Sequence, residues 1–137
     1  MDYRAYVPRC AAGTVLIACL AASCLPPSGA TAAAPTGAAD FNARCGGCHS
    51  TRAGANGIGP SLAGVYGRTS GAAPGYHYSP AIANAKLVWN DATLNKFLQG
   101  PSGLVRGTKM FANVPDAATR QQIIDYLKNQ NSQAAGE

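Results

Sequence analysis

The segment Cys45-Gly46-Gly47-Cys48-His49 limits what this chain can fold into more than any other. Two thiols separated by two small residues, with an imidazole directly after the second, match the C-x-x-C-H pattern for covalent attachment of a c-type haem. At this spacing both thiols reach the vinyl groups on one edge of a porphyrin, and the histidine falls on the iron. The segment therefore predicts one haem c, tethered through Cys45 and Cys48, with His49 as an iron ligand.

Three other arrangements could use the same cysteines. A thioredoxin-like redox pair needs a strand leading into the motif, and no strand is predicted before Cys45. A structural zinc site needs four ligands, which Cys45, Cys48, His49 and His77 could nominally supply, but neighbouring ligands at 48 and 49 close a tetrahedron poorly. A disulfide across only two residues would be strained. All three are weaker interpretations than haem attachment.

The beginning of the chain has the order of residues found in a secretory signal peptide. Arg4 and Arg9 precede a mostly apolar run over residues 11–25, and an A-x-A cleavage sequence stands at 30–32. The run is shorter than the roughly 20 residues that a membrane-spanning helix needs. We therefore predict that residues 1–32 are a cleaved signal peptide and that the mature protein is periplasmic, without stable membrane insertion.

A second processing signal is a lesser alternative. Leu16-Ile17-Ala18-Cys19 resembles the lipobox of bacterial lipoproteins, in which the cysteine is acylated, but it would leave a short apolar core. Removal of 32 of the 137 residues leaves 105, with Cys45 and Cys48 as the remaining cysteines and Met110 as the remaining methionine. Loss of two arginines and one aspartate changes the net charge from +5 to +4.

The rest of the chain predicts one all-α domain with long loops. We expect a small-residue linker at 33–39, the domain at 40–128 and a polar, frayed C-terminal tail at 129–137. Short helices are predicted through Phe41 and Arg44, from Ser79-Pro80 to Asn84, from Asn90 or Asp91 to Gly100-Pro101, and from Asp116 onward. Three to five short helices joined by glycine-rich loops bury too little on their own, so the haem is expected to fill the centre.

The second axial ligand is predicted by elimination among Met110, His77 and the lysines. Met110 lies 62 positions after Cys48, far enough for the chain to reach the opposite haem face, and Gly107-Thr108-Lys109 before it is typical of a loop. A lone methionine can instead fill a gap in the core. His77 is expected to lie exposed in a loop. We predict that the metal ligands are His49 and Met110.

From about Gly37 to Lys128 the chain resembles the soluble class I cytochromes c of mitochondria and bacteria. The residues that carry the resemblance follow in the same order: Phe41, the haem segment, Gly59-Pro60-Ser61-Leu62, Tyr66-Gly67-Arg68, Ala73-Pro74-Gly75-Tyr76, Trp89, Gly107-Thr108-Lys109-Met110 and Tyr126-Leu127-Lys128. The resemblance implies the class I cytochrome c fold, with its helices and long loops wrapped around one covalent haem. It also implies that the first and last helices cross at Phe41 and Tyr126, with Gly37 between them.

The resemblance further implies roles for residues outside the haem segment. Pro60 would offer its backbone carbonyl to the second ring nitrogen of His49, which fixes the tautomer of a metal-binding histidine. Buried carboxylates need donors or positive charge. The residues implied to surround the haem propionates are Arg68, Tyr78, Trp89 and Thr108.

Three residues depart from the family pattern. Arg106 stands where a proline is common, so the loop carrying Met110 is expected to be less rigid. Phe97 replaces a tyrosine whose hydroxyl approaches the methionine sulfur, so a changed reduction potential is expected. Ile82 takes a position that is often asparagine beside a buried water, which predicts a drier pocket.

These features predict a single-electron carrier and not an enzyme, because the sequence shows no acid–base pair or open metal position. The expected partners are redox proteins (an oxidase, a reductase or a dehydrogenase) that a monomer contacts transiently at the haem edge. Arg106 and Lys109 would favour acidic partners there. Nucleic acid is not expected as a partner. Two alternatives stay open: a dedicated cytochrome c subunit of a periplasmic dehydrogenase complex and, less favoured, a peroxidase-like haem enzyme with a labile Met110.

Overall fold

Five helices and the loops between them form residues 36–134, the part of the chain that this computed structural model describes. The helices are α1 (Thr36–Arg44), α2 (Pro80–Asn84), α3 (Asp91–Gln99), α4 (Pro101–Leu104) and α5 (Ala117–Ala134). Within residues 36–134 the extended pairing is limited to an isolated bridge between Thr69 and Val88. The predicted all-α class, with three to five short helices and long loops, is confirmed.

The signal peptide predicted at 1–32, and the alternative lipobox at Cys19, lie outside the described residues. Across 36–134, no helix combines the length and the apolar character needed to cross a membrane. Of the linker predicted at 33–39, the residues from Thr36 onward already belong to α1. The reason is that this stretch takes part in a helix crossing, which the local composition does not reveal.

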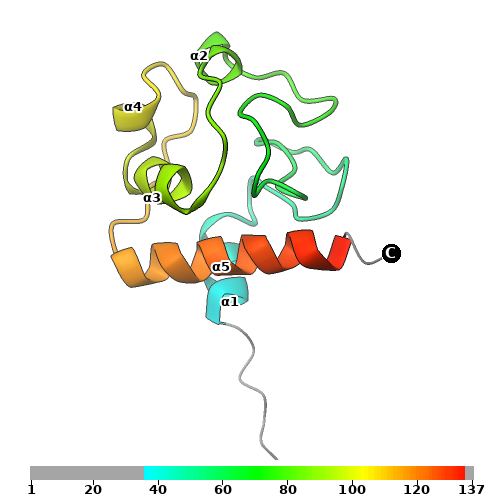
Figure 1. Cartoon of the computed structure of the whole chain (residues 1–137), viewed down its shortest axis with the longest axis vertical. Helices are drawn as coiled ribbons and strands as arrows, with labels where there is room; N and C mark the ends of the chain where they lie inside the picture. Colours follow the sequence, from blue (N-terminus) through cyan, green and yellow to red (C-terminus); the bar gives the residue numbers. More distant parts are fainter. Residues whose placement is uncertain (1–35, 135–137) are drawn as a thin grey trace, which may run out of the picture. The chain divides into compact units, whose positions relative to one another are not determined.

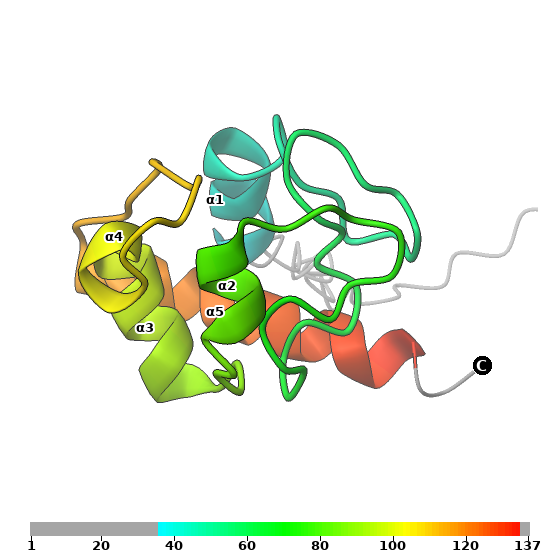
Figure 2. The same ribbon diagram turned by 90° about the horizontal axis from the view of Figure 1, so that it is seen from above.

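Helix α1 crosses α5, and both lie on the side of the domain away from the loops and from α2 (Figures 1 and 2). A Cβ atom added to Gly37 would come within 2.1 Å of the Gln122 carbonyl oxygen, so only glycine permits this approach. One turn later the Phe41 ring packs against Tyr126, with 5.3 Å between the ring centroids. The crossing implied by the resemblance is therefore present.

Helix α3 begins at a side-chain cap and ends at a glycine, as predicted. The Asn90 side chain accepts a hydrogen bond from the Thr93 backbone N–H at 3.0 Å, and the Thr93 hydroxyl accepts one from the Asn90 N–H at 2.8 Å. This reciprocal capping satisfies two N–H groups that a helix leaves unpaired. Gly100 follows the last residue, but Pro101, which we expected only to stop the helix, is the first residue of α4. Proline ends one helix and suits the first position of the next equally well.

Helix α5 runs further than the sequence indicates. Its start is capped by the Asp116 carboxylate, which accepts a hydrogen bond from the Thr119 N–H at 2.7 Å. The expected fraying from Asn129 is wrong for residues 129–134, which continue the helix. The Asn131 side-chain amide donates to the Tyr66 carbonyl oxygen at 2.6 Å, so a contact distant in sequence holds this polar end in place.

A polar cluster joins the start of α3 to the second half of α5. The Lys128 ammonium lies 2.6 Å from one Asp91 carboxylate oxygen, and the Tyr66 hydroxyl donates to the other. The Lys128 ammonium also lies 5.0 Å from the centre of the Tyr66 ring, within cation–π range. The hydrogen bond from Lys128 and, as the next largest cause, the hydrogen bond from Tyr66 lower the pKa of the Asp91 carboxyl group to about 2.

We expect Gly37→Ala to lower the free energy of unfolding by about 1–3 kcal/mol, the cost of adding atoms where packing leaves no room. Gly103→Ala in α4 is the control, because a Cβ at Gly103 meets nothing within 4 Å. Guanidinium unfolding of the haem-loaded protein, followed by far-ultraviolet circular dichroism, measures both. Equal stability of the two variants would contradict the close crossing.

The Asp91 cluster predicts a dependence of stability on pH. A carboxyl group whose pKa is depressed by folding stabilises the protein above its ordinary pKa of 3.8, and this contribution is lost as the pH falls through the folded value of about 2. We expect the stability difference between the wild type and Asp91→Asn to be constant above about pH 5 and to shrink as the pH falls from about 4 toward about 2. Parallel unfolding profiles over that window would contradict the assignment.

Candidate functional site

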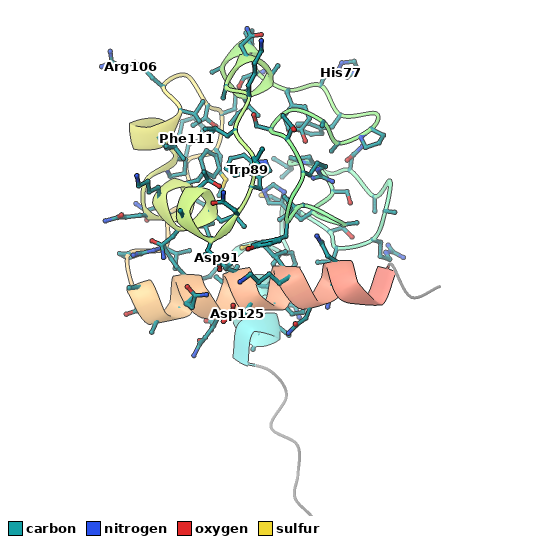
Figure 3. The ribbon with its side chains drawn as sticks, viewed as in Figure 1. His77, Trp89, Asp91, Arg106, Phe111 and Asp125 are labelled. Atoms are coloured by element: carbon teal, nitrogen blue, oxygen red, sulfur yellow. The ribbon has the colours of Figure 1, made fainter. Side chains whose placement is uncertain are left out.

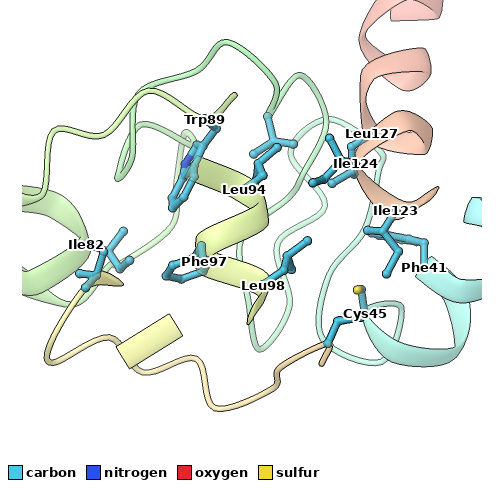
Figure 4. Close-up of a cluster of buried hydrophobic side chains, with 13 residues drawn as sticks. Phe41, Cys45, Ile82, Trp89, Leu94, Phe97, Leu98, Ile123, Ile124 and Leu127 are labelled. Carbon is cyan, nitrogen blue, oxygen red and sulfur yellow. The ribbon is translucent and has the colours of Figure 1, made fainter. Parts of the chain in front are cut away.

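A cavity of about 530 Å³ lies inside the domain, within the size range of sites that bind small molecules and cofactors. Figure 4 shows the cluster of buried apolar side chains, most of which line this cavity. The cavity brings together every site residue predicted from the sequence. Its lining includes Cys45, Cys48, His49, Pro60, Arg68, Tyr78, Trp89, Thr108 and Met110.

The haem segment continues the end of α1 as a tight turn. The Cys45 N–H donates to the Phe41 carbonyl at 2.7 Å, and the His49 N–H donates to the Cys45 carbonyl at 2.9 Å. This turn places both thiols and the imidazole on the wall of one cavity. Both cysteines are free, Cys45 buried and Cys48 exposed, so the disulfide alternative is not realised.

Burial raises the pKa of the Cys45 thiol, and the nearby Arg44 charge opposes this shift only in part. A thiol with a raised pKa is protonated at neutral pH and is a poor nucleophile or redox centre. The raised pKa therefore argues against Cys45 as an activated nucleophile or a redox cysteine.

The orientation of His49 is set by the residues that follow it. Its Nδ1 atom lies 2.8 Å from the Pro60 carbonyl oxygen. A carbonyl can only accept, so Nδ1 carries the proton and Nε2 keeps its lone pair for a metal. A Cβ at Gly59 would come within 2.2 Å of the ring atom Cε1, so the backbone at 59 packs directly on the imidazole.

Asn56 supports this arrangement and was missed by the sequence analysis. Its side-chain oxygen accepts a hydrogen bond from the Ser61 N–H at 2.9 Å, and its amide donates to the Pro74 carbonyl at 3.0 Å. Asn56 therefore fixes the loop around Pro60 and joins it to the next loop. An isolated asparagine in a glycine-rich segment looks like an ordinary turn residue, so no local signal points to this role.

Met110 enters the same cavity from the segment between α4 and α5, and it is half-buried. Its N–H donates to the Thr108 hydroxyl at 3.3 Å. Phe97 and Ile82, two of the departures from the family pattern, also line the cavity, and Phe97 packs against Trp89 with 5.0 Å between ring centroids. The third departure, Arg106, is exposed on the loop before Met110 (Figure 3).

The polar residues implied for the propionates gather on the cavity wall. Arg68 is fixed there by hydrogen bonds from its guanidinium to the Ala63 carbonyl at 2.7 Å and the Ser61 carbonyl at 2.9 Å. The Tyr78 hydroxyl accepts from the Ala73 N–H at 3.3 Å, which leaves its own proton available. A mainly apolar cavity with such a polar portion fits the plate and the carboxylates of a haem.

His77 is exposed and lies outside the cavity wall (Figure 3). The four-ligand zinc alternative is therefore not assembled, and residues 36–134 contain no group of three or more His, Cys, Asp or Glu side chains suited to a metal ion. Two thiols, one imidazole and one thioether, from Cys45, Cys48, His49 and Met110, line the same cavity, and this set of groups fits a covalently bound haem.

The family model for cytochrome c matches residues 34–131. The chain belongs to the cytochrome c family. It is 54% identical over 89 residues to a cytochrome c of Euglena viridis, covering 64% of this chain and 87% of the relative. It is 46% identical over 86 residues to cytochrome c2 iso-2 of Magnetospirillum fulvum, covering 62% of this chain and 90% of the relative. The solved structure of cytochrome cH from Methylobacterium extorquens matches with a TM-score of 0.63 at 40% identity, over 68% of this chain and 94% of that one.

Membership of this family establishes the cofactor and the general activity. Cytochromes c bind haem c covalently through a C-x-x-C-H segment, so the haem of this cytochrome is carried by Cys45 and Cys48. The proteins of this family are electron carriers, and this cytochrome belongs with them.

Contact between Gly59 and His49 generates a prediction about haem loading. Gly59→Ala is expected to push the imidazole out of line with Pro60 and to lower the fraction of chains carrying covalent haem roughly tenfold, as loss of a metal ligand's supporting contact does. Gly47→Ala is the matched control within the haem segment, since a Cβ there meets nothing within 4 Å. The pyridine haemochrome absorbance per mole of protein reports the difference, and equal loading of the two variants would refute it.

Proposed function

We propose that this cytochrome c is a periplasmic single-electron carrier whose haem iron is held between His49 and Met110. One observation carries the proposal: a histidine with an oriented ring and the only methionine of residues 36–134 line the same cavity. The signal-peptide pattern at 1–32 supports the location, because c-type haem is attached outside the bacterial cytoplasm.

The bound haem supplies a one-electron iron(III)/iron(II) couple. His49 would hold the iron through Nε2, because its Nδ1–H is directed at the Pro60 carbonyl, and the ring would not need to turn when the charge changes. The Met110 thioether would favour the reduced metal and raise the potential. The buried side chains of Phe97, Leu98 and Trp89 make their part of the cavity lining apolar and exclude water from it. Arg68 supplies a positive charge at the polar part of the lining.

The surface beside the cavity suits a small, transient contact with a redox partner. Phe111 is 90% exposed and Ile58 is 79% exposed, and both border the cavity. Lys109, directly before Met110, is exposed, and so is Arg106, three positions before Lys109. Apolar contacts with a positive rim favour a partner with an apolar patch and acidic surroundings, such as an oxidase, a reductase or a dehydrogenase. We propose that the cytochrome meets this partner as a monomer.

The exposure of Phe111 and Ile58 also favours a second candidate. Two large apolar side chains exposed at one cavity are the kind of surface that a lasting interface covers. A dedicated subunit of a periplasmic dehydrogenase complex would use them in this way. Gel filtration of the native periplasmic fraction separates the two: elution of haem absorbance at the size of the monomer supports the free carrier, and elution with an enzyme supports the subunit.

Loss of the Met110 thioether is the direct test of ligation. In the oxidised protein, sulfur ligation gives a weak near-infrared band, and we expect Met110→Ala to abolish it. The reduction potential should fall by a substantial part of the roughly 0.8 V over which axial ligands shift haem potentials. His77→Gln is the control that excludes the other histidine as a ligand, and it should keep both the band and the potential. A Met110→Ala protein that retains the band, or a His77→Gln protein that loses it, would overturn the ligand assignment.

A further inference from the structure

We propose that Arg120 is a positioning residue for Met110: it fixes the far end of the segment that brings the thioether to the haem. This inference rests on the proposed ligation by Met110. It concerns a residue that lies outside the lining of the cavity and that the sequence analysis did not select.

Arg120 lies in the first turns of α5 and is only 6% exposed. Its Nη1 atom donates to two backbone carbonyls, those of Val114 at 2.8 Å and Pro115 at 2.7 Å. Its Nε atom donates to the Asn95 side-chain oxygen on α3 at 3.1 Å. All three acceptors are neutral oxygens, so the guanidinium is held by directed hydrogen bonds and not by a close ion pair.

Burying a charged group is costly unless its hydrogen bonds are made, and an apolar side chain would usually pack there at lower cost. An arginine in this place is therefore better explained by the geometry that it imposes than by net stability. The guanidinium presents its donors at fixed angles, which a lysine ammonium does not. Arg120 thereby sets the position of one short stretch of backbone, Val114-Pro115, relative to α3 and α5.

That stretch is the end of the segment that carries Met110. Val114 is anchored from two sides: its N–H donates to the Leu98 carbonyl of α3 at 2.7 Å, and its carbonyl accepts from Arg120. Between this anchor and Met110, residues 111–113 are exposed. The Met110 side chain packs against the core cluster, and its N–H donates a long hydrogen bond of 3.3 Å to the Thr108 hydroxyl, so no short hydrogen bond within residues 36–134 fixes its backbone.

The distance along the chain is short enough for the anchor to matter. Val114 lies four positions after Met110, and an extended chain spans at most about 3.3–3.6 Å per residue. A displaced Val114 therefore changes the range of positions open to the thioether. On the other side of Met110, Arg106 takes the place of a stiffening proline, so the α5 end of the segment carries more of the restraint.

The test compares local release of Met110 with global unfolding in the full haem-loaded chain. Guanidinium titrations of Arg120→Gln and Arg120→Lys are followed by the near-infrared band, which reports Met110, and by far-ultraviolet circular dichroism, which reports the helices. We expect the band to disappear before the helices unfold, with a wider gap between the two midpoints than in the wild type. The equilibrium constant for releasing Met110 should rise roughly tenfold for each charged hydrogen bond lost. Arg120→Lys keeps the positive charge and loses the fixed geometry of the guanidinium donors. The gap between its two midpoints should lie between those of the wild type and Arg120→Gln.

Asp91→Asn is the matched control. It breaks a contact between α3 and α5 two turns further along α5, away from Val114, so both of its midpoints should shift together. If the two midpoints of the Arg120 variants also shift together, the role of Arg120 is structural only and the proposal is overturned. A wild-type protein without the near-infrared band would instead overturn the ligation by Met110, and this inference with it.

Discussion

The apolar side chains of this domain surround a space of about 530 Å³ that none of them fills. Of the buried core cluster, all members except Val105 and Ile124 line that space. Helices as short as α1 to α4 are marginal without tertiary packing, and apolar side chains gain dispersion contacts only where other atoms pack against them. The covalent haem is therefore the centre of the hydrophobic core as well as the redox group, and whatever binds only the folded chain stabilises it.

The two sides of the cavity are held to different degrees. Around His49, the backbone of Gly59 packs on the ring, the Pro60 carbonyl accepts a hydrogen bond from the Nδ1–H, and the Asn56 amide donates to the Pro74 carbonyl. Around Met110, the side chain packs against the core cluster and the N–H donates to Thr108, and further support lies at Val114, which hydrogen bonds join to α3 and α5. The His49 side is therefore restrained by its immediate neighbours, whereas part of the restraint on Met110 comes from contacts made four positions further along the chain.

Structural features that depend on residues adjacent in the sequence could be predicted, and features that depend on contacts between distant residues could not. Asn90 and Asp116 cap the helices that start beside them, and the haem segment contains its whole chemistry in five residues. By contrast, the last turns of α5 are polar and look frayed until Asn131 meets Tyr66, 65 positions away. Arg120 and Asn56 likewise acquire their roles from carbonyl groups that folding brings to them. Pro101 was ambiguous for another reason, because one residue both ends α3 and begins α4.

The crossing of α1 and α5 joins the two ends of the domain and so closes the chain into a ring through a noncovalent contact. The haem segment with His49 follows α1 directly, and the segment with Met110 directly precedes α5, so the two residues lie near opposite ends of this ring of chain. The glycine-rich loop over residues 54–75 lies between His49 and Met110 in the chain and takes no part in the crossing of α1 and α5. A single peptide bond cut there would leave two fragments, one with the tethered haem and one with the methionine, that the helix crossing still holds together. The close approach of Gly37 to Gln122 would then act as the join between the two fragments.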